Sequence, residues 1–286
     1  SPDQVADLTG QLGGQVDVAW EVPLDSAGLT LDGAQSVLDD YRDLTDTALL
    51  LTRLANEQQE PITAAAQIVA ETLVHDGLVH VFGSGHSHML ALEGFYRAGG
   101  LAAVDPLLVP SLMLHSNAVL STALERTEGI GASLFADLQP GPHDSFILVS
   151  NSGGNRVAIE LARSARQAGL AVIAIVSAAH ARSALALGAQ QGHVQAANLI
   201  DLADVVIDNL GAVGDAATTV AGVAATMGPT STVTGAAIIH AIAIEAAALA
   251  AAAGVTPAVF SSSNVAGGDA RNAEAIARYR GRVRSL

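Results

Sequence analysis

The sequence predicts an α/β protein in which helices cover both faces of a parallel sheet, giving three layers. Short apolar runs alternate with stretches of helical spacing over residues 75–286. Several of the runs end in Gly and Ser, as strands do before a tight turn into a helix. Strands separated by about 10–15 residues of helix are typical of right-handed βαβ units.

The N-terminal part is predicted to differ from the rest of the chain. Residues 1–34 have scattered Gly and Pro and the only tryptophan, Trp20, so we expect an irregular arm that packs on the body or on a partner subunit. A helical pattern covers residues 31–75 with an interruption at 56–61, where Pro61 suits the first turn of a second helix. No repeat or linker is seen within 75–286, so residues 35–286 are predicted to form one domain with N-terminal helices.

Five apolar runs are predicted to form the strands, at residues 78–82, 101–109, 145–149, 171–176 and 205–207. Stretches of helical spacing follow several of them, and we expect helices at residues 88–97, 155–169, 231–253 and 270–283.

Residues 235–254 are almost wholly apolar, close to the about 20 residues that a membrane span needs. The segment contains His240 and Glu245 and is mostly alanine, so we expect a buried central helix instead. The N-terminus lacks a basic start followed by an apolar run, so no signal peptide is predicted. The expected location is the cytoplasm, without membrane association.

Composition narrows the classes of ligand. Net charge is −15 and the pI is about 4.7, which disfavours nucleic acid and anionic membranes as partners. Aromatic residues make up 3% of the chain, which leaves little surface for stacking bases or flat cofactors, and no cofactor is predicted. Cysteine and lysine are both absent, which excludes thiolate chemistry, Schiff bases and the phosphate-binding lysine of a Walker A loop.

Two loops of similar composition follow predicted strands. In the first, Gly83 and Gly85 let the backbone turn sharply, Ser84 and Ser87 offer hydroxyl donors, and His88 opens the next helix. The second contains the residues Ser150, Asn151, Ser152, Gly153, Gly154 and Asn155. Ligands bind at the carboxyl ends of strands in such sheets, where hydroxyls, backbone N–H groups and helix ends hold an anion without lysine.

We therefore predict that the two loops bind a phosphate group. The alternative is that both are ordinary strand-to-helix turns with capping Ser and Asn residues. The same composition after two strands of one sheet favours the binding interpretation.

Several stretches together resemble the sugar isomerase (SIS) domain, a phosphosugar-binding module, and more closely a bacterial SIS subfamily of uncharacterised proteins labelled UPF0309. These stretches are 83–100 (GSGHSHMLALEGFYRAGG), 124–129 (LERTEG), 150–155 (SNSGGN), 207–215 (IDNLGAVGD), 228–232 (GPTST) and 264–272 (NVAGGDARN). The resemblance runs from about residue 45 to the end of the chain.

The resemblance implies a three-layer αβα sandwich with a five-stranded parallel sheet, and assembly into homodimers or larger homo-oligomers. It also implies phosphate contacts at Ser84, Ser87, Ser150, Ser152 and Asn155. It does not imply one reaction, because SIS domains occur in isomerases, in an etherase and in sensors that catalyse nothing.

Isomerisation of a sugar phosphate needs a base and an acid. The candidate catalytic residues are Glu125, His86 and His240, each with a structural alternative. Glu125 suits a surface ion pair with Arg126, His86 suits packing or capping, and His240 suits a satisfied core position. Glu93 and Arg97 have the spacing of a structural pair four residues apart on a helix.

Two further features complete the predicted site. Thr230 and Ser231 open the long apolar helix with hydroxyls that suit sugar or phosphate contacts. His86 and His88 invite a metal interpretation, but the spacing matches no fixed metal motif, and no metal is predicted.

The leading hypothesis is a protein that binds a hexose or amino-sugar phosphate and isomerises it by proton transfer. The alternative is a phosphosugar-binding sensor or regulatory module without catalysis. A dinucleotide enzyme is disfavoured because the third glycine of its motif would fall at His88.

Overall fold

The computed structural model describes the backbone of residues 31–190 and 197–286 and the side chains of residues 44–187 and 197–286. The chain divides into two compact units, Ser1–Arg42 and Asp43–Leu286. The arm predicted for residues 1–34 lies, up to residue 30, outside the described residues. Helix α2 spans Leu31–Glu57 and α3 spans Gln59–Val74, which confirms the predicted helical region and its interruption.

A five-stranded parallel sheet forms the centre of the second unit, as predicted. Its strands are β1 (Val79–Gly83), β2 (Val104–Pro106), β3 (Ser145–Val149), β4 (Ala171–Val176) and β5 (Val205–Asp208). Their order across the sheet is β2-β1-β3-β4-β5. All four pairings are parallel, as right-handed strand–helix–strand connections require.

The strand predicted at residues 101–109 is wrong in length, because β2 keeps only three residues. Leu101 instead forms an antiparallel bridge with Val259, and the N–H of Ala102 donates to the carbonyl of Ala258 at 2.9 Å. The strand ends at Pro106, although the N–H of Leu107 still donates to the carbonyl of Val81 at 2.9 Å. Residues 258–260 therefore pair with the first part of the segment that was predicted to belong to this strand.

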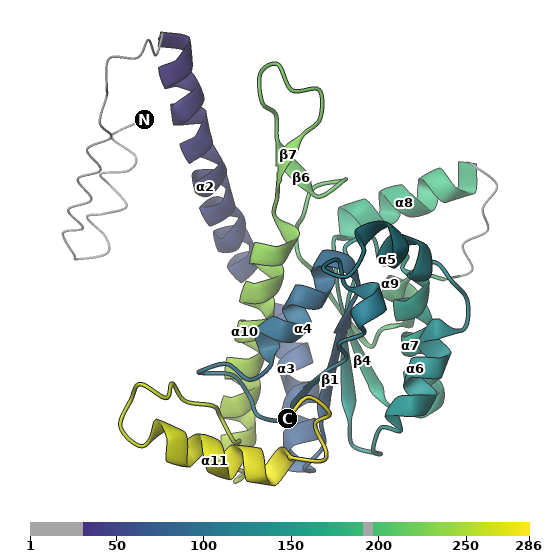
Figure 1. Cartoon of the computed structure of the whole chain (residues 1–286), viewed down its shortest axis with the longest axis vertical. Helices are drawn as coiled ribbons and strands as arrows, with labels where there is room; N and C mark the ends of the chain where they lie inside the picture. The colour runs from purple at the N-terminus through teal and green to yellow at the C-terminus, as the bar shows by residue number, and fades with distance from the viewer. Residues whose placement is uncertain (1–30, 191–196) are drawn as a thin grey trace. The chain divides into compact units, whose positions relative to one another are not determined.

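Helices cover both faces of the sheet (Figure 1). On one face α3, α4 (His88–Gly94) and α10 (Ser231–Ala252) enclose a core of aliphatic side chains. On the other face α6 (Ile130–Leu138), α7 (Arg156–Gln167) and α9 (Leu199–Leu202) enclose a second core that includes two phenylalanines, Phe82 and Phe146. Strand side chains alternate between these cores, which explains why every residue of β1 and β3 is buried.

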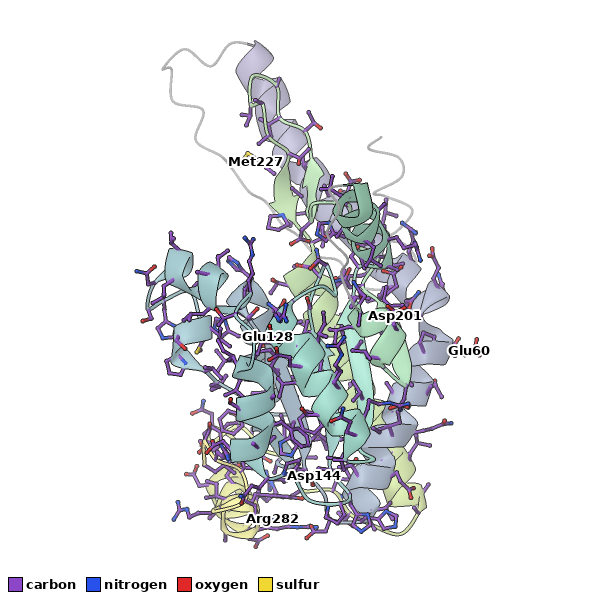
Figure 2. The ribbon with its side chains drawn as sticks, turned by 90° about the vertical axis from the view of Figure 1, so that its right-hand side faces the viewer. Glu60, Glu128, Asp144, Asp201, Met227 and Arg282 are labelled. Atoms are coloured by element: carbon purple, nitrogen blue, oxygen red, sulfur yellow. The ribbon has the colours of Figure 1, made fainter. Side chains whose placement is uncertain are left out.

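The remaining elements are short or lie outside the main sheet. They are the 3₁₀ turns η1 (Gly85–Ser87) and η2 (Pro110–Leu112), α5 (Ala118–Leu124), α8 (Ala178–Gln190), and the hairpin of β6 (Ala216–Thr218) and β7 (Met227–Pro229). The last helix, α11, spans Gly268–Tyr279, close to the predicted 270–283. Figure 2 shows Met227 on the hairpin, with Asp144 and Arg282 at the opposite end of this unit.

Helix α10 is the apolar helix that the sequence predicted to be buried at the centre; seven of its 22 residues are buried, so the prediction holds for one side of the helix only. It packs against α3 and α4, and a Cβ atom on Gly235 would overlap the side chain of Leu90, so glycine permits this close approach. By length and composition it is the one helix within the described ranges that meets the criteria for a membrane span, and a single such helix is weak evidence of a membrane protein.

A charged cluster is buried below the amino ends of the strands. The two ring nitrogens of His80 lie 3.0 Å from Oδ2 of Asp105 and 2.9 Å from Oδ2 of Asp144. The carboxylate of Asp144 also accepts the backbone N–H groups of Leu78 and Gly141, each at 2.8 Å. This cluster joins β1 to β2 and to the turn before β3, and the sequence analysis did not identify it.

Burial by itself lowers the pKa of His80, but the hydrogen bonds and negative charges of Asp105 and Asp144 outweigh it and raise that pKa. Burial by itself raises the pKa of Asp144, but the hydrogen bonds from His80, Leu78 and Gly141 outweigh it and lower that pKa. Both pKa shifts favour the charged form of the group, imidazolium for His80 and carboxylate for Asp144.

Candidate functional site

The two predicted loops lie side by side at the carboxyl end of the sheet. Gly83, the last residue of β1, pairs with Val149, the last residue of β3, so the loops begin at the same level. A Cβ atom on Gly83 would lie 2.5 Å from the carbonyl carbon and oxygen of Ser87, and Gly85 has a φ of 57°. Both glycines are therefore needed for the tight turn that η1 makes.

The second loop is hydrogen-bonded to the start of α9. Its Gly153 has a φ of 63°, and a Cβ atom there would overlap the side-chain oxygen of Asn198. Asn198 donates from Nδ2 to the carbonyl of Ser152 at 3.1 Å, and the N–H of Leu199 donates to the carbonyl of Gly153 at 2.9 Å. Asn198 is fully buried, so these contacts hold the loop in one shape.

Three polar side chains join the loops to each other. Ser84 donates from its hydroxyl to Oε2 of Glu125 at 2.7 Å. Asn155 donates from Nδ2 to Oγ of Ser84 at 2.7 Å and to Oε2 of Glu125 at 3.0 Å. Glu125 lies directly after α5, so one carboxylate connects that helix to both predicted phosphate loops.

Glu125 was predicted as a catalytic residue or as a surface carboxylate paired with Arg126. Its carboxylate bonds to the loops rather than pairing with Arg126. The neighbouring Glu128 lies at the surface with 80% of its side chain exposed and pairs with Arg156 at 2.8 Å. The two glutamates of this segment therefore have different surroundings.

The start of α10 adds a third component to the site. A cavity of about 10 Å³ lies where the two loops, β3, α4, the turn after β5 and the start of α10 meet. Its lining residues are Ser87, Leu90, Val149, Asn151, Asn209, Ser231 and Thr232. Asn209 follows β5 and donates from Nδ2 to Oδ1 of Asn151 at 2.9 Å. Thr230, next to this cavity, is buried, and its hydroxyl has no hydrogen-bond partner within the described part of the chain.

Asp215 occupies the N-terminus of α10. It accepts from the N–H of Ser231 at 3.0 Å and from the hydroxyl of Ser231 at 2.7 Å.

Ser150 directly follows β3, where it is buried and its N–H donates to the carbonyl of Ile175 at 3.1 Å. The predicted binding residues thus lie in the two loops and at the start of α10.

The two histidines of the first loop differ in exposure. The ring of His86 is exposed and makes no hydrogen bond to any of the residues described. His88 is buried, its Nδ1 bonds to the carbonyl of Gly85, and its ring meets that of His115 edge-on with centroids 6.5 Å apart. His88 therefore contacts the backbone of its own loop and the ring of His115.

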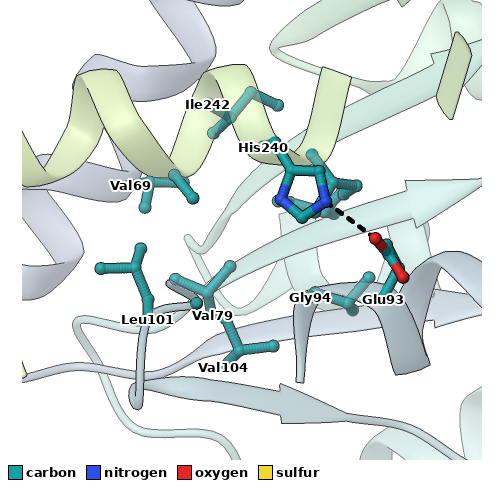
Figure 3. Close-up of a pocket in the computed structure, with 13 residues that line it drawn as sticks. Val69, Val79, Glu93, Gly94, Leu101, Val104, His240 and Ile242 are labelled. Carbon is teal, nitrogen blue, oxygen red and sulfur yellow. Dashed lines mark hydrogen bonds and ion pairs between the residues drawn. The ribbon is translucent and has the colours of Figure 1, made fainter. Parts of the chain in front are cut away.

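His240 lies farther along α10 and pairs with Glu93 of α4. Its Nε2 atom is 2.8 Å from Oε1 of Glu93 (Figure 3), and Arg97 also bonds to that carboxylate, as its spacing predicted. The pair borders a cavity of about 20 Å³ whose other walls are largely aliphatic. Because a helix rises about 1.5 Å per residue, His240 lies about 13 Å along the axis from Ser231.

The structure therefore brings some predicted residues together and separates others. Glu125 joins Ser84 and Asn155, whereas His86 and His240 have no contact with Glu125 among the side chains that are described. Asn198 was not predicted as a site residue, whereas Asn209, which follows β5, lies in the stretch 207–215 that carries the family resemblance. Within residues 44–187 and 197–286, no three His, Asp or Glu side chains are placed to hold a metal ion.

The chain matches a known domain family and curated relatives. Residues 44–177 match the model of the SIS domain. A UPF0309 protein of Listeria monocytogenes serotype 4b is 38% identical over 247 residues, covering 86% of this chain and 97% of that protein. A UPF0309 protein of Brucella anthropi is 39% identical over 246 residues, with 86% and 97% covered.

Two solved structures are more distant. Phosphoheptose isomerase from Neisseria gonorrhoeae gives a TM-score of 0.46 at 16% identity, covering 74% of this chain and 98% of that one. The sugar isomerase domain of the RpiR transcription factor from Sphaerobacter thermophilus gives a TM-score of 0.42 at 19% identity, with 74% and 94% covered. From its sequence relatives and its domain match, the chain belongs to the UPF0309 family of SIS-domain proteins.

Proposed function

We propose that this protein binds a hexose or amino-sugar phosphate between its two loops and isomerises the sugar by acid/base proton transfer. The observation that carries the proposal is the contact of Ser84, Asn155 and Glu125, because it brings the polar groups of both loops to one point. The match of residues 44–177 to the SIS domain supports a phosphosugar as the ligand.

The proposed phosphate contacts come from hydroxyls and amides. They are Ser84, Ser87, Ser150, Asn151, Ser152, Asn155, Thr230 and Ser231, with His88 shaping the loop. The buried hydroxyl of Thr230 supports this assignment, because a buried polar atom without a partner is rare unless it serves a ligand or a water molecule. Because the chain has no lysine, the proposed contacts rely on these hydroxyl and amide groups.

Two carboxylates are suited to proton transfer. Glu125 lies at the loops, beside the groups proposed to hold the phosphate, and its carboxylate can act as a base toward the bound sugar. Glu93 is bonded to His240, and such a pair supplies both a base and an acid. We propose Glu125 as the base at the loops, and Glu93 with His240 as a second acid/base pair; His86 is exposed next to the first loop and is kept as a candidate acid.

Binding is tested with a panel of sugar phosphates and their unphosphorylated parents, measured by thermal shift and then by isothermal titration calorimetry. Selective stabilisation by phosphorylated sugars is expected. Equal effects of both forms would contradict phosphate recognition. Turnover is tested by deuterium uptake at the sugar carbons in D₂O, and its absence with every sugar phosphate that binds would contradict isomerisation.

A sensor without catalysis is the second candidate function. The observation in its favour is that Glu125, His86 and His240 are not joined by contacts within the described part of the chain. A sensor would bind the same ligands and show no deuterium uptake, so the two assays separate the candidates.

We also propose a homodimer or larger homo-oligomer. Apolar side chains are exposed on α10 and the neighbouring hairpin, among them Ile244 at 69%, Met227 at 52% and Val233 at 45%. Exposed apolar groups gathered on one region are typical of protein interfaces.

A further inference from the structure

The donors expected to hold the phosphate are already engaged by a carboxylate of the protein itself. Ser84 has one hydroxyl proton, and it donates that proton to Glu125. Asn155 points its Nδ2 group at the same Oε2 atom. An ionised carboxylate only accepts hydrogen bonds, as a phosphate dianion does, so Glu125 occupies the chemical position of the ligand's anion.

The segment that carries Glu125 is suited to move. Helix α5 has seven residues, packs on η1 and η2, and exposes 82% of Val119 and 50% of Leu120. A helix this short has little stability of its own. The bonds from Ser84 and Asn155 to Glu125 join the end of this segment to both loops.

We infer that Glu125 is an internal anion that closes the site and is displaced by the phosphate of the ligand. The inference rests on the proposed function, since it assigns the phosphate to the same loops. On binding, Ser84 and Asn155 exchange the carboxylate for phosphate oxygens, and two negative charges are not tolerated at one set of donors. The freed carboxylate and α5 then move away from the loops and toward the sugar, where Glu125 acts as the base.

The first test compares Glu125→Gln with the wild type for binding of inorganic phosphate and of glucosamine 6-phosphate by calorimetry. The amide is uncharged and competes less well for the two donors, so the variant is expected to bind both anions on the order of tenfold more tightly while losing deuterium uptake. Glu128→Gln is the matched control, because its carboxylate is exposed and bonded to Arg156, and its affinity is expected to equal that of the wild type.

The second test uses the unchanged protein, so it does not depend on the folding of a variant. Amide hydrogen exchange is measured with and without saturating glucosamine 6-phosphate. Residues 83–88 and 150–155 are expected to exchange more slowly, and residues 117–128 faster, because α5 loses its link to the loops. Slower exchange in all three segments would overturn the inference, since it would mean that Glu125 stays in place and contacts the ligand.

The outcomes separate the inference from the function on which it rests. Binding by the wild type with equal or weaker binding by Glu125→Gln overturns the internal anion and leaves phosphosugar binding standing. Failure of both proteins to bind any phosphate or sugar phosphate overturns the proposed function and the inference with it. Tighter binding by Glu125→Gln together with faster exchange at residues 117–128 supports both.

Discussion

Nε2 of His80 lies 2.9 Å from Oδ2 of Asp144, in a cluster whose histidine is 2% exposed. The other ring nitrogen faces Asp105, and Asp105 in turn accepts the N–H of Arg284 at 3.0 Å. One buried ring thus ties β1 to β2, to the turn before β3 and to the C-terminal segment. Its charge state therefore bears on the stability of the whole domain.

The first prediction concerns alkaline pH. The pKa of His80 is raised above its ordinary value of 6.5, so the folded state binds this proton more tightly than the unfolded chain. The stability from His80 is complete below about pH 6.5 and is lost as pH rises through the raised pKa. Urea unfolding between about pH 6 and pH 9 is expected to show this fall in the free energy of unfolding, and less of it in His80→Gln. The exposed His86→Gln is the control; equal slopes in His80→Gln and the wild type would contradict the prediction.

The second prediction concerns Asp144. Asp144→Asn places an amide where His80, Leu78 and Gly141 all donate, so at least one donor loses its acceptor. Breaking a buried pair in this way is expected to cost about 3 kcal/mol of unfolding free energy. Because the pKa of Asp144 is lowered, its contribution is present above its unfolded value of about 3.9 and is lost as pH falls through the lowered pKa.

Denaturant unfolding at neutral pH and at pH values near 3 checks this. Asp137→Asn removes a carboxylate that is 75% exposed and pairs with Arg284, so it is the control and is expected to change stability little. A similar small effect of both substitutions would refute the importance of the buried cluster.

The third prediction concerns the second loop. Gly153→Ala adds a Cβ atom that overlaps Asn198 at a φ of 63°, so it is expected to destabilise the protein by about 3 kcal/mol and to abolish phosphate binding. Gly169→Ala has a φ of 77° with open space around the added atom, and it is expected to cost about 1 kcal/mol of backbone strain alone. Thermal unfolding and calorimetry measure both effects. Unchanged phosphate affinity in Gly153→Ala would show that this loop does not form the site.

The fourth prediction concerns the Glu93–His240 pair. Glu93→Gln and His240→Gln each remove an acid/base group, so deuterium uptake is expected to fall on the order of 100-fold or more with little change in ligand affinity. Arg97→Gln removes the second partner of Glu93 and keeps the bond to His240, so it is the control. Full turnover in His240→Gln would exclude this pair from the reaction.

The fifth prediction concerns assembly. Ile244→Asp places a charge on the exposed apolar face of α10 and is expected to shift the homo-oligomer toward monomer. Leu187→Asp, on α8, changes a similarly exposed side chain (54%) and is expected to leave the assembly unchanged. Analytical ultracentrifugation at several concentrations measures both. A monomeric wild type would refute the proposed oligomer.

Much of the fold was predictable because it is encoded in local patterns. Buried strands appear as short apolar runs, and four of the five predicted strands agree with the structure to within one residue at each end. The glycines of the two loops are also visible locally, since turns and close approaches demand them wherever they occur. The error at residues 101–109 arose because pairing with residues 258–260 depends on segments far apart in the chain.

The sequence by itself determined the strand-and-helix order, the two hydroxyl-bearing loops at one edge of the sheet, and the exclusion of lysine and cysteine chemistry. The tertiary structure alone decided which side chains meet. Ser84 and Glu125 are 41 positions apart, and His80 and Asp144 are 64 apart. Periodicity reports whether a residue is buried, whereas a contact between distant residues depends on how whole elements pack, and no local pattern records that.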